Sequence, residues 1–409
     1  MSRNLSPNVA IVIATVGLAA VFCLSALSTV VEAAWIGPNP VDPGGSLPTN
    51  SRLVFQNPRG LHRYYAFFFS MTSATLSYRY SSDAVKWSDP QFAIPGGSGS
   101  AGVWVHDSGV LLIVHAVASG TVPGSIVYRR GTISDFVDPI SWTQAQTVEP
   151  GGTNAGSFGL SITRTANGRP VITAVSEISI GGTYRYEVRA WGANADSATP
   201  VWTRASVIPS FTSLAQRQSS GFTSAYSSTG NYVFIAGSAA RALKSVGSPF
   251  DVSWVRASWD GVSWSVGTVT LLLSTQPVAR PCSLVIDDVS LPSLLVIYSQ
   301  DLFAYFVHYH GTVQDGTRFE TFSVAGQIVT SATLSIDLTS TPRKLKAIYH
   351  YGASNIYWKE TQTSPISWGA ENTIPWSDDT TDLASSQRAF VGRTHALAES
   401  SHGVYYLNI

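Results

Sequence analysis

Hydrophobic and polar residues alternate in short runs along most of the chain, from residue 53 to the C-terminus. Alternation over about four to eight residues is typical of β-strands that bury one face. Paired runs are joined by turns such as Asn167-Gly168, in which Gly and Asn supply the positive φ that tight hairpins need. The pattern therefore predicts consecutive antiparallel hairpins and an all-β fold.

The predicted hairpins alternate between inner hairpins and outer hairpins whose turn is followed by an aromatic residue. These aromatic residues are Trp87, Trp142, Trp202, Trp264, Phe319 and Trp368. They recur at steps of roughly 50 to 60 residues, and two hairpins per step give the four antiparallel strands of a β-propeller blade. We count seven inner hairpins and predict a β-propeller of seven four-stranded blades, with six blades as the alternative.

The N-terminal part of the chain contains an apolar segment without charged residues, at residues 9–31. About 20 such residues are enough to cross a bilayer as a helix. The small residues that follow also fit a signal-peptidase site, so we predict that residues 1–34 are either a signal peptide or a membrane anchor. Residues 35–409 then form a single propeller domain, in which residues 35–50 contribute a closing strand and a linker. We expect an extracellular protein that is either secreted or anchored.

The composition limits the partners of the protein. Lys and Arg number 25 and Asp and Glu number 25, so the formal net charge is zero and nucleic acid is not expected as a partner. The two cysteines, Cys23 and Cys282, exclude a disulfide framework within the domain. Zinc-binding motifs are missing from the sequence, so we expect no metal and no cofactor. The membrane is expected as a partner only through residues 9–31, and the oligomeric state is left open.

Two predicted outer turns, at residues 81–88 and 258–265, have similar sequences. They resemble the Asp-box, or bacterial neuraminidase repeat, of sialidase-like β-propellers. The usual motif is Ser-x-Asp-x-Gly-x-x-Trp, whereas here one residue fewer precedes the Trp, and the other four outer turns lack the full pattern. In that family the Asp accepts backbone hydrogen bonds and the Trp packs between blades. The resemblance therefore implies a structural role for Asp83, Trp87, Asp260 and Trp264.

Arginines precede four of the predicted inner hairpins, on the face opposite to the outer turns. They are Arg52, Arg217, Arg280 and Arg388. Guanidinium groups that converge on one point bind a carboxylate bidentately. Because sialidases hold the carboxylate of their sugar with three arginines, the resemblance implies a ligand-binding role for these residues. The alternative is that they brace the loops by pairing with neighbouring carboxylates or carbonyls.

The same face is predicted to carry acidic and tyrosine residues that suit glycoside hydrolysis. Glycosidases use two carboxyl groups, and sialidases use a Tyr nucleophile activated by Glu together with an Asp acid/base. The candidate catalytic residues are Glu177, Asp301, Glu399 and Tyr298, with Tyr349, His115, His350 and His402 as further residues of this face. The sequence does not fix their separation, so catalytic residues are not assigned and it is left open whether the protein is an enzyme.

Three functions are compatible with these observations. The first is an exported propeller that binds a glycan or glycoconjugate, because Trp and Tyr stack on sugar faces and hydroxyl-rich loops form adaptable hydrogen bonds. The second is a sialidase-type glycoside hydrolase that grips a sugar carboxylate with the arginine cluster. The third is a non-catalytic scaffold for protein interaction or for the cell envelope. We favour the first.

Overall fold

The computed structural model describes most of the chain from Ile36 onward. The described residues are 36–42, 45–46, 53–57, 64–70, 75–94, 101–106, 108, 110–119, 122–133, 139–149, 157–180, 183–211, 221–227, 232–240, 250–276, 282–287, 293–300, 303–310, 320–322, 329–351, 355–363, 365–376, 380–385, 394–400 and 402–409. The predicted N-terminal helix lies outside these residues. Gly37–Ile409 form one compact unit, and no helix in the described part of the chain is long and apolar enough to cross a membrane.

The described strands form seven sheets, which we number in chain order. The first sheet contains β2 (Gly45–Ser46), β3 (Val54–Gln56), β4 (Tyr64–Ser70), β5 (Thr75–Ser81) and β6 (Gln91–Ile94). The second contains β7 (Ala101–Val105), β8 (Val110–Ser119), β9 (Val122–Thr132), β10 (Ser141–Trp142) and β11 (Gln146–Glu149). The third contains β12 (Ser157–Arg164), β13 (Pro170–Ile180), β14 (Thr183–Ala193) and β15 (Trp202–Phe211).

The other four sheets are built in the same way. The fourth contains β16 (Gly221–Ser227), β17 (Tyr232–Ala240), β18 (Phe250–Trp259), β19 (Trp264–Val266) and β20 (Thr270–Gln276). The fifth contains β21 (Cys282–Asp287), β22 (Ser293–Gln300), β23 (Phe303–His310) and β24 (Glu320–Phe322). The sixth contains β25 (Val329–Asp337), β26 (Lys344–Tyr351), β27 (Asn355–Gln362) and β28 (Asn372–Pro375). The seventh contains β29 (Thr380–Ser385), β30 (His395–Ser400) and β31 (Gly403–Asn408), and β1 (Ile36–Asp42) lies beside β31.

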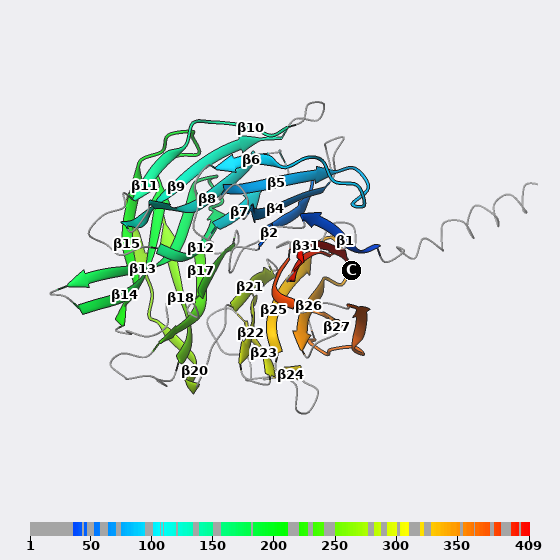
Figure 1. Cartoon of the computed structure of the whole chain (residues 1–409). Helices are drawn as coiled ribbons and strands as arrows, with labels where there is room; N and C mark the ends of the chain where they lie inside the picture. Colours follow the sequence, from blue (N-terminus) through cyan, green and yellow to red (C-terminus); the bar gives the residue numbers. More distant parts are fainter. Residues whose placement is uncertain are drawn as a thin grey trace, which may run out of the picture. The chain divides into compact units, whose positions relative to one another are not determined.

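The sheets are drawn in Figure 1, and most neighbouring sheets share a cluster of buried hydrophobic residues. The fourth and fifth sheets contact each other through β16, β17 and β21. Tyr128 and Trp191 belong to one cluster that joins the second and third sheets. Phe67 and Tyr406 belong to another, which joins the first sheet to the seventh. Each sheet thus packs against the next in chain order, and the seventh packs against the first. This closed series of sheets and the antiparallel pairing inside them confirm the all-β propeller with antiparallel blades that the sequence predicts.

The repeated tryptophans lie at contacts between sheets. Trp142 of the second sheet packs edge-on against Tyr78 of the first, with ring centres 6.1 Å apart. Trp202 of the third sheet packs in the same way against Tyr128 of the second, at 5.1 Å. The predicted marker Phe319 lies outside the described residues. The outer turns that carry Trp142 and Trp202 therefore each place an aromatic ring on the preceding sheet. This contact explains why the aromatic residue recurs once per period.

The two turns that resemble an Asp-box share one hydrogen-bond pattern. Oδ1 of Asp83 accepts hydrogen bonds from the backbone N–H groups two and three residues further on, at 2.9 and 2.8 Å. Oδ1 of Asp260 does the same at 2.7 and 2.8 Å. These hydrogen bonds lower the pKa of both carboxyl groups. The next residue adopts left-handed backbone in both turns, with φ of 61° at Ala84 and 104° at Gly261, so both are structural turns.

The tryptophans of these two turns contact other sheets. The ring centre of Trp87 lies 5.4 Å from that of Tyr406 in the seventh sheet. The indole Nε1 of Trp264 donates a hydrogen bond to the carbonyl of Thr203 in the third sheet, at 2.9 Å. We call the end of the sheets that carries these turns the Asp-box face, and the other end the opposite face. Because the strands alternate in direction, the turns at residues 165–169 and 338–343 also lie on the Asp-box face.

Candidate functional site

The arginine cluster expected from the sequence stays a prediction. Arg52, Arg217, Arg280 and Arg388 lie outside the described residues, as does Asp301. Glu177 lies in β13, Tyr298 in β22 and Glu399 in β30, and each is close to the end of its strand at the opposite face. The structure therefore places these three residues at one face but in three different sheets, and it describes the side chain of Glu399 alone among them.

Tyr349 is the one candidate tyrosine whose side chain is described. Its ring is fully buried and stacks on Tyr357 with ring centres 6.1 Å apart. Its hydroxyl donates a hydrogen bond to the carboxylate of Glu371. This tyrosine–glutamate pair has the residue types of a sialidase nucleophile and its base, but a fully buried ring cannot reach a sugar. We therefore assign Tyr349 to packing in the sixth sheet.

A cluster of charged side chains lies where the second sheet meets the third, and we call it the Glu149 cluster. Its members are Glu149 of β11, Glu187, Arg189 and Trp191 of β14, and Arg204 and Ser206 of β15. Residues two apart in a strand point to the same face, so the three β14 residues share one side of the third sheet. The register pairs Arg189 with Ser206 and Trp191 with Arg204, which brings the β15 residues beside them.

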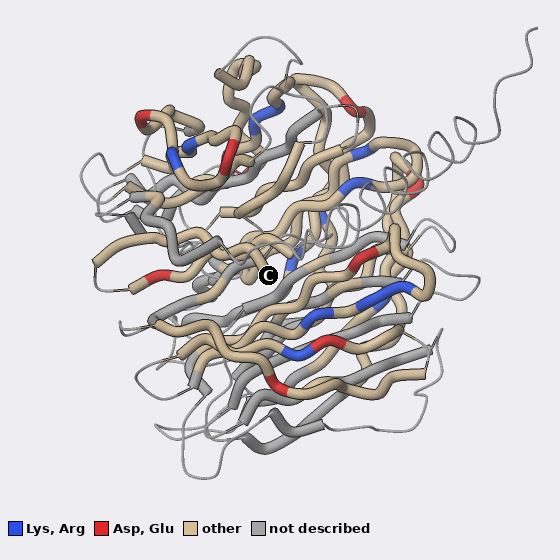
Figure 2. The backbone as a smooth tube through the Cα atoms, turned by 90° about the vertical axis from the view of Figure 1, so that its right-hand side faces the viewer, with Lys and Arg blue, Asp and Glu red and all other residues tan. Residues whose placement is uncertain are grey.

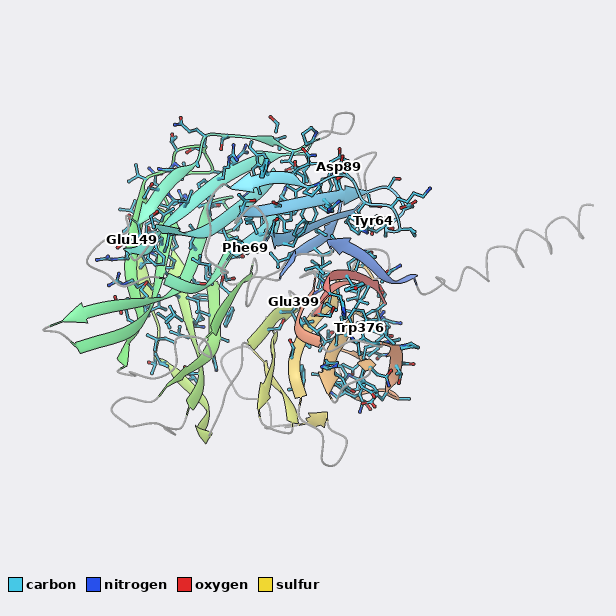
Figure 3. All side chains as sticks on the ribbon, viewed as in Figure 1. Tyr64, Phe69, Asp89, Glu149, Trp376 and Glu399 are labelled. Carbon is cyan, nitrogen blue, oxygen red and sulfur yellow. The ribbon has the colours of Figure 1, made fainter. Side chains whose placement is uncertain are left out.

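Glu149 reaches this cluster from the neighbouring sheet. One of its oxygens lies 2.8 Å from Nη1 of Arg204 and 3.7 Å from Nη1 of Arg189. Its other oxygen accepts a hydrogen bond from the indole of Trp191 at 3.2 Å. Figure 3 labels Glu149 at the edge of β11, well away from Glu399. The carboxylate thus joins two sheets and binds two guanidinium groups.

The second carboxylate of the Glu149 cluster is that of Glu187. It forms an ion pair with Nε of Arg189 and accepts a hydrogen bond from the hydroxyl of Ser206 at 3.1 Å. Solvent exposure increases across the cluster, since the Arg189 side chain is 8% exposed and the Arg204 side chain is 47% exposed. Two carboxylates and two guanidinium groups sum to zero charge. The cluster therefore presents paired donors and acceptors to solvent without a net charge.

No motif or spacing in the sequence indicates this cluster. Glu187 and Arg189 lie in a stretch to which the sequence pattern assigns no site, and Glu149 lies far from Arg204 in sequence. Their proximity depends on the register between β14 and β15 and on which strand lies at the edge of the second sheet. Alternating hydrophobicity indicates which side of a strand is buried, but it does not identify the residues that meet across two sheets.

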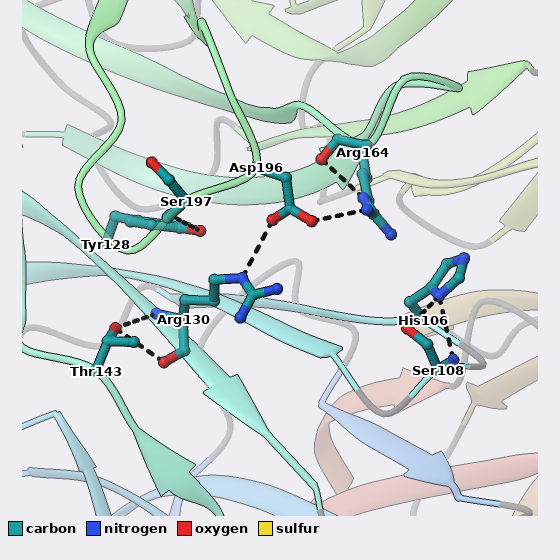
Figure 4. A network of polar contacts seen from close by, with 9 residues as sticks. His106, Ser108, Tyr128, Arg130, Thr143, Arg164, Asp196 and Ser197 are labelled. Atoms are coloured by element: carbon teal, nitrogen blue, oxygen red, sulfur yellow. Dashed lines mark hydrogen bonds and ion pairs between the residues drawn. The ribbon is translucent and has the colours of Figure 1, made fainter.

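A second polar network joins the same two sheets on the Asp-box face (Figure 4). Asp196 accepts hydrogen bonds from Nε of Arg130 in β9 at 3.2 Å and from Nη2 of Arg164 in β12 at 2.7 Å. Arg164 also donates to the carbonyl of Gly168 at 2.7 Å, and its guanidinium lies 5.7 Å from the ring centre of Trp104. Because each oxygen of Asp196 is bound by a different arginine, this network braces the two sheets.

A third aspartate turn, which was not predicted, joins β25 to β26. Oδ1 of Asp337 accepts hydrogen bonds from the backbone N–H of Thr339 at 2.8 Å and of Ser340 at 3.3 Å, and both hydroxyl groups also donate to this carboxylate. Burial alone would raise the pKa of Asp337, but the hydrogen bonds from Ser340 and Thr339 lower it below its ordinary value of 3.8. The folded protein therefore favours the charged carboxylate.

The lowered pKa of Asp337 predicts a pH-dependent effect of the Asp337→Asn substitution. A carboxyl group with a depressed pKa in the folded state stabilises the fold above its unfolded pKa, and this contribution is lost as the pH falls through the folded pKa. The amide side chain of this variant keeps one acceptor oxygen but carries no charge, so we expect a loss of about 1 kcal/mol at pH 7. Urea unfolding of both proteins should show a smaller difference at pH 3 than at pH 7. An equal difference at the two pH values would contradict the assignment.

The chain matches no family model and no curated protein sequence. Its structure is similar to that of AofleA from Arthrobotrys oligospora, at 12% identity over 76% of this chain and 82% of that chain, with a TM-score of 0.47. It is also similar to Trypanosoma rangeli sialidase, at 10% identity over 78% of this chain and 55% of that chain, with a TM-score of 0.45. An α-L-arabinanase from Penicillium chrysogenum gives 10% identity over 76% and 92% of the two chains, with a TM-score of 0.48. The chain thus spans about half the length of the sialidase, and likenesses at this level carry no conclusion about ligand or activity.

Proposed function

We propose that the protein is a glycan-binding β-propeller that holds its ligand at the Glu149 cluster. In this proposal each of the seven sheets is one blade, and the ligand lies between the second and third blades. The observation that carries the proposal is the half-exposed guanidinium of Arg204, which Glu149 holds beside a buried arginine–glutamate pair.

The chemistry of the Glu149 cluster suits an uncharged sugar. Neighbouring sugar hydroxyl groups are donors and acceptors at once, so they pair with planar groups that offer two acceptors or two donors. Glu149 and Arg204 supply one group of each kind. Because the charges of the cluster sum to zero, its ligand does not need to be charged. Trp202, which is half-buried beside Gln146 of β11, adds an aromatic surface at the same edge of the sheets.

We propose further that the protein acts outside the cell. The support is the apolar segment at residues 9–31, which is long enough to direct export either as a signal peptide or as an anchor. Glycans of cell surfaces are accessible to a protein in that location.

A glycan array followed by calorimetry tests the proposed site. The purified full chain is screened on the array, and the affinity of the strongest glycan is measured by isothermal titration. We expect Arg204→Gln to weaken binding at least tenfold, because the guanidinium donors are lost from a site where charge-assisted hydrogen bonds hold the ligand. Because the Arg204 side chain is half-exposed, its substitution should leave the fold intact.

Arg169→Gln is the matched control for this experiment. Arg169 belongs to the same sheet but lies on the Asp-box face, where its guanidinium donates to the carbonyl of Asp260. Its substitution should leave glycan affinity unchanged. Equal affinities for the wild type and Arg204→Gln would overturn the proposed site, and an array without any bound glycan would overturn the proposed function.

A further inference from the structure

A cleft between the sixth and seventh sheets, at the Asp-box face, has no role in the proposed function. Its walls include Ser335, Asp337, Lys344, Lys346, Glu360 and Thr394, and it encloses about 280 Å³ together with the solvent at its mouth. We call it the Lys346 cleft. The register pairs Ser335 with Lys346 and Lys346 with Glu360, so these three side chains form a row on the side of the sixth sheet that faces the seventh.

Lys346 is held in the cleft by groups from both sheets. Its Nζ donates a hydrogen bond to the main-chain oxygen of Ile409 at 2.8 Å and lies 4.9 Å from the ring centre of Trp358. The carboxylate with which it forms an ion pair, that of Glu360, is 3.7 Å away. Burial, which is the largest influence, lowers the pKa of Lys346, and the neighbouring Lys344 lowers it further, while Glu360 and Asp337 raise it. The net shift is downward because the effect of burial is not offset by the two carboxylates.

Lys344 shares the carboxylate of Glu360 with Lys346. Its Nζ is 2.8 Å from Oε1 of Glu360, and its side chain is half-exposed at the mouth of the cleft. Asp337 also lines the cleft, but its oxygens accept hydrogen bonds from Thr339 and Ser340 in its own turn. The two ammonium groups and the two carboxylates among the described residues of the cleft sum to zero charge, so an anion would be held there by hydrogen-bond donors and not by an excess of positive charge.

The hydroxyl of Ser335 supplies an independent sign of a ligand. Its Oγ is buried and has no hydrogen-bond partner in the part of the chain that the structure describes. A buried hydroxyl without a partner costs about 1–3 kcal/mol, so such groups are uncommon unless a bound molecule satisfies them. Ser335 lines the cleft beside Lys346. An acceptor placed in the cleft would complete its hydrogen bonding.

We propose that the Lys346 cleft binds a small oxyanion, which accepts hydrogen bonds from the ammonium groups of Lys344 and Lys346 and from the hydroxyl of Ser335. Carboxylate, sulfate and phosphate groups share this chemistry, since each presents several acceptor oxygens on one centre. The group is either a free ion or part of an acidic sugar. The site is separate from the Glu149 cluster, which lies between other sheets.

Isothermal titration of the full chain with sodium phosphate, sodium sulfate and glucuronate tests this proposal, at constant ionic strength maintained with chloride. Glucose serves as the uncharged comparison. We expect saturable binding of at least one anion that Lys344→Gln weakens, whereas any binding of glucose should be unaffected by Lys344→Gln. Tighter binding of glucuronate than of phosphate and sulfate would identify an acidic sugar as the source, and the reverse would identify a free ion.

Four substitutions locate the bound anion. Lys344→Gln should weaken binding at least tenfold, whereas Lys86→Gln, at an exposed lysine of an Asp-box-like turn, should leave it unchanged. Glu360→Gln should tighten binding several-fold because it removes the carboxylate that competes for both ammonium groups. Ser335→Ala should weaken binding without lowering the unfolding midpoint, since it removes a hydroxyl that has no partner among the described residues.

Three outcomes would overturn the proposal: no saturable binding of any of the three anions, equal losses in Lys344→Gln and Lys86→Gln, or weaker binding in Glu360→Gln. The variant Arg204→Gln tests whether the Lys346 cleft is independent of the Glu149 cluster. This substitution should leave anion binding unchanged even where it abolishes glycan binding.

Discussion

Replacing Trp259 by alanine should lower the free energy of unfolding by about 3–5 kcal/mol, the range for large aromatic residues removed from a core. Trp259 ends β18 in the fourth sheet and is buried against the third sheet. Its indole Nε1 donates to the carbonyl of Ala193 at 2.8 Å, and its ring lies 5.1 Å from that of Trp264. The substitution thus opens a cavity between two sheets and leaves a buried carbonyl without its donor. Chemical denaturation at pH 7 measures the loss.

Val262→Ala is the control for Trp259→Ala. Val262 lies three residues away in the same turn but is exposed, so its substitution should change stability by less than about 0.5 kcal/mol. Gly192→Ala tests the same contact from the other sheet, because a Cβ at Gly192 would lie 2.4 Å from the Trp259 ring. Combining Gly192→Ala with Trp259→Ala should cost less than the sum of the single losses. Additive losses would show that the two residues do not share a contact.

Replacing Arg189 by methionine should lower the free energy of unfolding by about 3 kcal/mol, because it removes a buried cation from between two carboxylates. Arg189 forms ion pairs with Glu187 and Glu149, and its side chain is almost fully buried. Methionine keeps much of the apolar volume, so the loss reports the missing charge and hydrogen bonds. Urea denaturation at pH 7 measures it.

A second variant separates charge from packing at Arg189. In the double variant Arg189→Met with Glu187→Gln, one of the two carboxylates left behind is neutralised, so part of the lost stability should return. Arg204→Gln should cost less than about 1 kcal/mol by itself, because its ion pair with Glu149 is half-exposed. Equal losses in Arg189→Met and Arg204→Gln would contradict the graded burial of the cluster.

The fold was predictable because its signals are local. Trp142 and Trp202 recur at a spacing that corresponds to one sheet, and each packs on a tyrosine of the preceding sheet. The turns at Asp83 and Asp260 were found because Ser, Asp and Trp follow one another at close spacing. These features depend only on residues that are close in sequence, and the period of the pattern predicts how the sheets repeat along the chain.

The Glu149 cluster and the Lys346 cleft were not predictable from such signals. Glu149 meets Arg204, and Lys346 meets Ile409, across sheet boundaries between residues that are distant in sequence. Both contacts depend on strand register and on the packing of one sheet against another. The turn at Asp337 was missed for another reason, since it lies in an inner hairpin and lacks the aromatic residue that marks the outer turns.

Figure 2 shows basic and acidic residues interspersed along the described strands on the side that faces the viewer. This distribution agrees with the formal net charge of zero. In the proposed function, recognition therefore depends on local pairing, as in the Glu149 cluster, and not on a long-range field.

The most direct test of the proposed function is a crystal structure of the protein with the strongest glycan from the array. We predict an intact sugar between β11 and β15, with hydroxyl groups within hydrogen-bond distance of Arg204 and Glu149. A sugar bound only among the arginines predicted at the opposite face, without contact to Arg204, would contradict the proposal and would favour the site expected from the resemblance to sialidases.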